Sequence, residues 1–60
     1  MNNHLPKDPV MLLSVVNTKL RDYYDSLEEF AAAEGVEKEE IEALLKKINY
    51  IYDVEQNKFV

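Results

Sequence analysis

The 60-residue sequence contains no cysteine and no tryptophan, one glycine, one histidine and two prolines. Without cysteine the chain cannot form a disulfide, and one histidine alone cannot supply a Cys/His cluster for zinc. One glycine is too few for a glycine-rich phosphate-binding loop. No apolar run approaches the ~20 residues of a membrane span. We therefore expect a cytoplasmic protein with no membrane, metal or cofactor partner.

A chain this short forms one small domain. Such a domain buries only about 60% of its unfolded surface, and its core rarely supplies more than ~3–5 kcal/mol. With no disulfide or metal to help, its stability must come from close helix packing or from self-association. We expect a single domain over residues 1–60, in which residues 1–7 form a flexible arm.

Catalysis is not predicted. The only histidine, His4, lies in the arm, and a nucleophilic triad needs an oriented base beside its nucleophile. The glutamates are more simply read as a hydrated helix face than as an acid/base pair or a metal site. We expect a non-enzyme with no catalytic, cofactor-binding or metal-binding residues.

Charge is distributed unevenly along the chain. Twelve Asp and Glu against seven Lys and Arg give a net charge of −5, and residues 1–25 are balanced. Residues 26–47 hold seven glutamates against three lysines, a net of −4. This segment repels phosphate rather than attracting it.

Capping residues and apolar spacing predict three helices. Asp8 and Pro9 begin a helix over 9–24, whose core stripe is Leu12, Leu13, Val16, Leu20, Tyr23 and Tyr24. Ser26 and Glu29 form a capping box for a helix over 27–34, with Leu27, Phe30 and Ala31 inward and Gly35 at its end. The third helix is expected over 38–48, after a hydrophobic staple between Val36 and Ile41, and Asn49 ends it. Its core-facing residues are Ile41, Leu44, Leu45 and Ile48.

The chain then changes to a strand pattern. Two short runs of strand formers, expected at 50–53 and 57–60, flank a polar loop, which predicts a β-hairpin over residues 50–60. The spacing of Ala31, Gly35, Val36, Ile41 and Leu44 is typical of a helix-turn-helix. The predicted fold is therefore mainly α: a three-helix, helix-turn-helix-like domain closed by a C-terminal hairpin, a winged-helix plan in miniature.

Two segments carry a resemblance to a known family. The stretch LPKDPVMLLSVVNTKLRDYY and the tail NYIYDVEQNKFV resemble a small bacterial family called domain of unknown function 4250. The resemblance covers about Leu5 to Val60, and members more often carry glycine where Asn49 stands. It implies a stand-alone protein of one domain. It implies no activity and no functional residues.

We interpret the chain as a small non-enzymatic protein-interaction or regulatory module. Its predicted interaction surface comprises Met11, Val15, Tyr23, Tyr24, Tyr50 and Tyr52. Met11 and Val15 lie off the main stripe, where either the hairpin or arm covers them or they form a homodimer contact. The tyrosines are read first as rim residues of the core and second as an aromatic recognition patch.

The alternative is a weak DNA- or RNA-binding winged helix-turn-helix protein. Its contacts would be the cations Lys19, Arg21, Lys38, Lys46, Lys47 and Lys58. However, the helix that would enter a groove begins Glu37-Lys38-Glu39-Glu40. Because helix packing alone also produces this spacing, nucleic acid is the less favoured partner.

Overall fold

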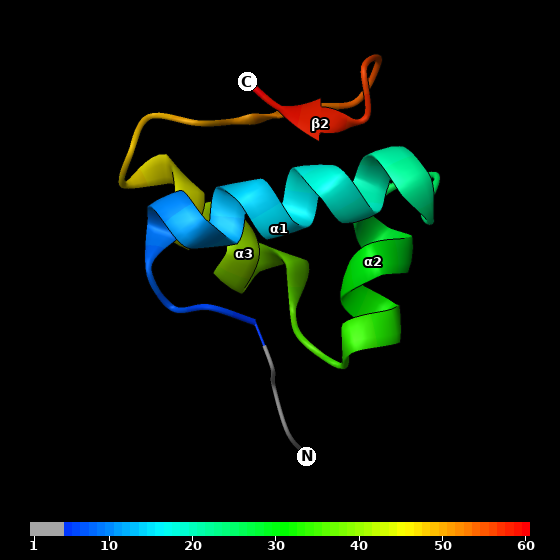
Figure 1. Cartoon of the computed structure of the whole chain (residues 1–60), viewed down its shortest axis with the longest axis horizontal. Coiled ribbons are helices and arrows are strands. Elements are labelled where there is room, and N and C mark those ends of the chain that lie inside the picture. Colours follow the sequence, from blue (N-terminus) through cyan, green and yellow to red (C-terminus); the bar gives the residue numbers. More distant parts are fainter. Residues whose placement is uncertain (1–4) are drawn as a thin grey trace.

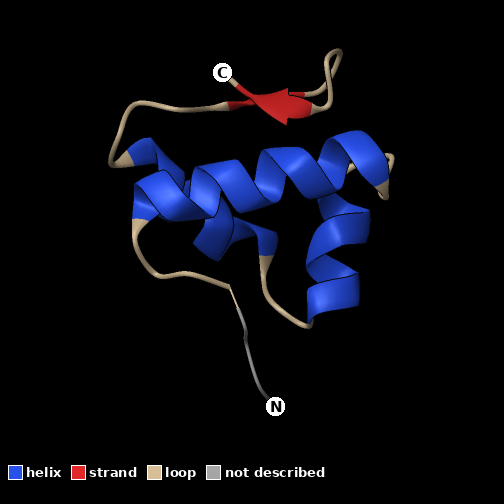
Figure 2. Cartoon of the chain, in the orientation of Figure 1, coloured by secondary structure: helices blue, strands red, loops and turns tan. Residues whose placement is uncertain are grey.

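The computed structural model describes residues 5–60. Three helices come first, α1 (Pro9–Asp22), α2 (Leu27–Glu34) and α3 (Lys38–Lys46), and an antiparallel pair of strands follows, β1 (Tyr52–Asp53) and β2 (Lys58–Phe59). Figures 1 and 2 show the hairpin running beside α1. The predicted fold class, a mainly helical domain closed by a C-terminal hairpin, is confirmed.

The first helix begins as predicted and ends early. The Asp8 carboxylate accepts a hydrogen bond from the Met11 N–H at 3.1 Å, with Pro9 in the first turn. The helix stops at Asp22 rather than at residue 24, because Tyr23 adopts φ −129° and leaves the helical path. The Tyr23 side chain is consequently 71% exposed. Its predicted place on the core stripe is wrong.

The turn between α2 and α3 follows the predicted chemistry. The Ser26 hydroxyl caps α2 by accepting from the Glu29 N–H at 3.1 Å, and the Glu29 carboxylate accepts from the Asp25 N–H at 3.3 Å. Gly35 has φ 73°, a left-handed conformation that costs glycine little. The Val36 N–H then bonds back to the Ala31 carbonyl at 3.0 Å, which closes the helix end.

The third helix ends at Lys46, before the predicted residue 48. A turn over residues 47–49 follows it, in which Asn49 has φ 68°. The Tyr50 N–H donates to the Leu45 carbonyl at 3.0 Å, the six-residue closure of a helix C-terminus. Asn49 thus occupies the left-handed position that glycine usually takes.

The hairpin is shorter than the predicted strands over 50–53 and 57–60. Tyr52 lies opposite Phe59, and Ile51 and Val60 extend the pairing with two backbone hydrogen bonds of 2.9 Å each. Asn57, with φ 56°, belongs to the turn. The Asp53 carboxylate supports this turn by accepting from the Glu55 and Gln56 N–H groups at 2.9 and 3.3 Å.

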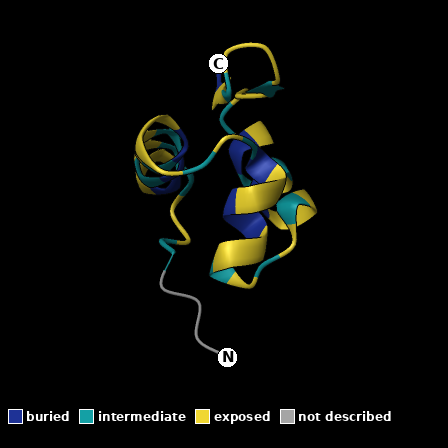
Figure 3. Cartoon of the chain, turned by 90° about the vertical axis from the view of Figure 1, so that its right-hand side faces the viewer, coloured by how far each residue is buried: buried dark blue, intermediate teal, exposed yellow. Residues whose placement is uncertain are grey.

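The core draws on all three helices and on β2. Its buried residues are Leu12, Val16, Leu20, Leu27, Phe30, Ala31, Ile41, Leu45 and Phe59. Figure 3 shows the buried sides of the helices turned toward one another. Residues 1–4 of the predicted arm lie outside the described residues, whereas Leu5 packs against the core. At Leu5, therefore, the arm is part of the folded structure.

Gly35→Val should destabilise the fold by about 1–2 kcal/mol or more, because a β-branched residue is disfavoured at positive φ. Gly35→Asn is the matched control, since asparagine tolerates this conformation better. Urea denaturation monitored by circular dichroism measures both variants. Equal stability of Gly35→Val and the unchanged chain would contradict the left-handed turn.

Candidate interaction surfaces

The side chain of Asn17 on α1 holds the edge of β2. Its Nδ2 donates to the Phe59 carbonyl at 3.1 Å, and its Oδ1 accepts from the Phe59 N–H at 2.8 Å. Since Ile51 and Val60 form a hydrogen-bonded pair, both backbone groups of Phe59 point away from β1. The Asn17 amide therefore takes the place that a further strand would occupy along this edge.

Asn57 fastens the hairpin turn to the ends of two helices. Its Nδ2 donates to the Leu20 and Tyr24 carbonyls at 3.2 and 2.9 Å, and its Oδ1 accepts from the Tyr52 hydroxyl. That hydroxyl also accepts from the Leu27 N–H at 3.2 Å, at the start of α2. The hairpin is thus attached to the helices at both its strands and its turn.

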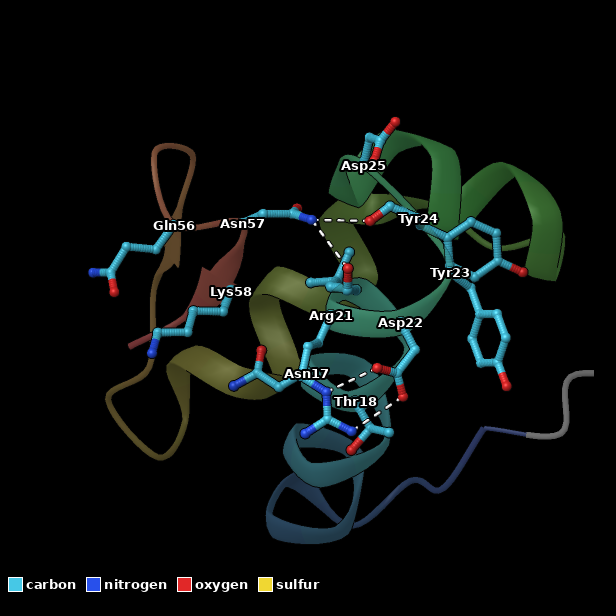
Figure 4. Close-up of a pocket in the computed structure, with 11 residues that line it drawn as sticks. Asn17, Thr18, Arg21, Asp22, Tyr23, Tyr24, Asp25, Gln56, Asn57 and Lys58 are labelled. Carbon is cyan, nitrogen blue, oxygen red and sulfur yellow. Dashed lines mark hydrogen bonds and ion pairs between the residues drawn. The ribbon is translucent and has the colours of Figure 1, made fainter.

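A cleft of about 790 Å³ lies between the second half of α1 and the hairpin turn (Figure 4). Three amide side chains line it: Asn17 and Asn57 already bond to the backbone, and Gln56 donates to the Asp53 carboxylate. Arg21 pairs with Asp22 at 2.9 Å, and Lys58 and Asp25 add one charge of each sign. Because its polar groups serve the fold and its charges balance, this cleft offers no arrangement that favours a particular ligand.

Residues 5–60 contain no group of three or more His, Cys, Asp or Glu side chains placed to hold a metal ion. Within that range the helices are all too short or too polar to cross a membrane.

The outward face of the hairpin carries adjacent apolar side chains. Residues alternate across a strand, so Tyr52 and Phe59 face the core while Ile51 and Val60 face away. Ile51 is 65% exposed and Val60 50%, whereas Phe59 is 2% exposed. Tyr50 and Ile51 also border a hollow of about 160 Å³ beside α3. We call Tyr50, Ile51 and Val60 the hairpin patch.

The six residues predicted as an interaction surface do not form one patch, although Tyr23 contacts Tyr24 with ring centroids 6.5 Å apart and Tyr50 and Tyr52 border the same hollow. Tyr24 packs edge-on against Phe30, with ring centroids 5.6 Å apart, and Tyr52 belongs to the Asn57 network. Met11 is 60% exposed, and Val15 on the same helix is half-buried. Met11 and the exposed Tyr23 are separated by twelve residues, about 18 Å along a helix. Only Tyr50 belongs to the hairpin patch.

Sequence reasoning did not select Ile51 or Val60 as site residues. The signal was present in the alternation of the two strands, but using it required knowing that Phe59 points inward. A short apolar run does not by itself show which face is buried.

The predicted nucleic-acid contacts are partly engaged within the protein. The Glu28 carboxylate lies 3.3 Å from Lys38 Nζ, and this hydrogen bond and charge raise the pKa of Lys38. The hydrogen bond from Arg21 lowers the pKa of Asp22, and Lys19 Nζ lies 5.3 Å from the Tyr23 ring centroid. The side-chain hydrogen bond from Gln56 is the main cause that lowers the pKa of the Asp53 carboxyl, and the charge of Lys58, opposite it in the hairpin, adds a smaller effect. Within residues 5–60, exposed Lys46 and Lys47 form no ion pair.

A family model described as "Domain of unknown function (DUF4250)" matches residues 6–59. The chain belongs to this family. The match confirms the resemblance seen in the sequence, and the description names no activity for the DUF4250 domain. No curated protein and no solved structure matches the chain.

Asn17→Ala should destabilise the DUF4250 domain by about 1–3 kcal/mol, because the Phe59 N–H and C=O lose their partner in a half-buried position. The exposed neighbouring substitution Thr18→Ala is the control. Thermal and urea unfolding would compare the two. Similar small losses in both variants would contradict the role given to the Asn17 amide.

The pKa of Asp53 should lie below its ordinary value of 3.8, because the Gln56 side-chain amide donates to it at 2.9 Å and the backbone N–H groups of Gln56 and Glu55 add further bonds. The turn therefore gains stability above the unfolded pKa and loses it as pH falls through the lowered folded pKa. NMR titration of the Asp53 carboxyl measures the shift. Gln56→Ala should raise the midpoint toward 3.8, and an unchanged midpoint would contradict the assignment.

Proposed function

We propose that this DUF4250 domain is a non-enzymatic protein-interaction module, and that the hairpin patch is the face to which its partner docks. The observation that carries the proposal is the adjacent exposure of Ile51 and Val60, which two backbone hydrogen bonds hold together. Apolar side chains exposed together on a surface are typical of interaction sites.

Rigidity of the hairpin supports this assignment. Asn17 bonds to the backbone of β2, and Asn57 bonds to the end of α1. A face held in one conformation loses less conformational entropy when it binds than a mobile loop does. The hairpin patch is therefore ordered before any partner arrives.

The alternative, weak DNA or RNA binding, has less electrostatic support. The exposed acids Glu37, Glu39 and Glu40 lie at the start of α3, where a reading helix would meet base edges. Lys46 and Lys47 lie at the other end of that helix. A pair of cations would release few counterions, so such binding would be weak and would depend only modestly on salt.

Ile51→Ser should abolish partner recovery, and Val54→Ser should not. Both change an exposed apolar residue of the hairpin region, but Val54 lies in the turn, outside the hairpin patch. The test is affinity recovery from native extract with nuclease treatment, quantified by mass spectrometry. With the purified partner, Ile51→Ser should weaken binding about 5- to 30-fold, as the loss of an interface anchor does.

If Ile51→Ser and Val54→Ser recover the same proteins, the hairpin patch is not the docking face. Salt-sensitive recovery of nucleic acid that is lost on nuclease treatment and weakened by Lys46→Glu or Lys47→Glu would favour the alternative function.

Self-association through Met11 is a separate proposal. Met11 is exposed, as a dimer contact on this face requires. Light scattering at micromolar and higher concentrations should give a mass that rises with concentration for the unchanged chain and stays monomeric for Met11→Glu. A monomer in both cases would contradict it.

A further inference from the structure

A second surface, away from the hairpin patch, is a groove. It lies between helix α3 and the segment that precedes α1. Its apolar wall is formed by Leu5, Pro6, Leu12, Val36, Ile41 and Leu44, which we call the α3 groove. The groove holds about 360 Å³, at the small end of the ~300–1,000 Å³ range of ligand pockets. Leu12 and Ile41 are buried at its base, and Leu44 and Val36 are half-buried at its sides. It has room for a short apolar anchor.

Glu40 lines the α3 groove, and Glu37 is the sequence neighbour of Val36, which also lines it. Glu40 and Leu44 are four residues apart within α3 and therefore lie on one face of that helix, whereas Val36 precedes its N-cap, Glu37. Glu37, next to Val36, makes no side-chain capping bond to α3. In the described part of the chain neither glutamate forms an ion pair. The acidic side of this groove is therefore free to meet positive charge.

Lys7 also lines the groove, so one cation stands against the two acids Glu37 and Glu40. Lys38, the lysine of the first turn of α3, is held by Glu28 on α2. Residues 26–47 as a whole carry a net charge of −4.

We propose that the α3 groove takes a basic amphipathic segment of another protein, with an apolar side chain in the groove and lysine or arginine beside Glu37 and Glu40. An amphipathic segment laid in a groove uses its apolar residues as anchors, and its charged residues set specificity. A second copy of this chain fits poorly, because each chain carries a net charge of −5. This inference rests on a different face from the proposed function, so either can fail alone.

The probe is a fluorescent amphipathic peptide built from leucine and lysine, compared with a peptide of the same pattern built from leucine and glutamate. Anisotropy titration of the full chain is made at about 0.15 M salt, where charges more than about 8 Å apart are largely screened. The lysine peptide should bind and the glutamate peptide should not. Amide NMR shifts on binding should centre on Val36, Ala43 and Leu44.

Two matched variants separate the groove from general charge attraction. Glu40→Gln should weaken binding of the lysine peptide about two- to five-fold, as loss of an exposed ion pair does. Glu55→Gln makes the same charge change in the hairpin turn and should leave binding unchanged. Ala43→Phe, at the exposed mouth of the groove, should abolish binding without lowering the denaturation midpoint.

Equal effects of Glu40→Gln and Glu55→Gln, or NMR shifts centred on the hairpin, would overturn the proposal. Amide NMR shifts of Val36 and Leu44 that change with protein concentration in the absence of peptide would also overturn the proposal, since a second copy of the chain would then fill the groove. Nuclear Overhauser contacts from residues 1–4 to Leu44 that persist when the peptide is added would also overturn it, because the chain itself would then be the occupant.

Discussion

The bonds between the Asn17 side chain and the backbone of Phe59 determine where the hairpin lies. Two short strands cannot support themselves in water, since a lone hairpin is at best marginally stable. Here the Asn17 amide satisfies one edge of the pair, and the Phe59 side chain enters the core formed by the helices. The hairpin gains its stability from α1, and its inward face completes a core that three short helices leave open.

Attachment of the hairpin has a consequence for the exposed surface. Because neighbouring residues on a strand face opposite ways, fixing Phe59 inward forces Val60 outward, together with its partner Ile51. The hairpin patch thus follows from the core packing. The α3 groove arises differently, where Leu5 and α3 leave a hollow above buried Ile41. One surface is apolar and the other carries acidic side chains, so they suit partners of different chemistry.

Local signals in the sequence predicted most of the fold. The caps at Asp8 and Ser26 and the turn at Gly35 lie where the sequence predicted them, because each depends on a side chain within a few residues. Helix ends were less accurate. Tyr23 has the spacing of a core residue, yet α1 ends before it, and no local residue type marks that end.

The candidate sites were much less predictable. Asn17 and Phe59 are 42 residues apart in sequence, and nothing in the local pattern of either indicates their pairing. Tyr52 was interpreted first as a rim residue of the core and second as part of an interaction patch. It packs against the core, and its hydroxyl takes part in the Asn57 network, which only the folded chain brings together. The acidic character of α3 was evident from composition. The groove beside that helix could not be predicted without knowing where Leu5 lies in the folded chain.

The central claim is that the hairpin and the helices form one cooperative unit, joined through Asn17. Native-state hydrogen exchange at the Phe59 amide tests it most directly, because that N–H donates to the Asn17 side chain rather than to β1. The account predicts that Phe59 exchanges with the same opening free energy as the most protected amides of α1, which report global unfolding. Fast exchange at Phe59 while the α1 amides stay protected would show that the hairpin opens on its own, and would contradict the account.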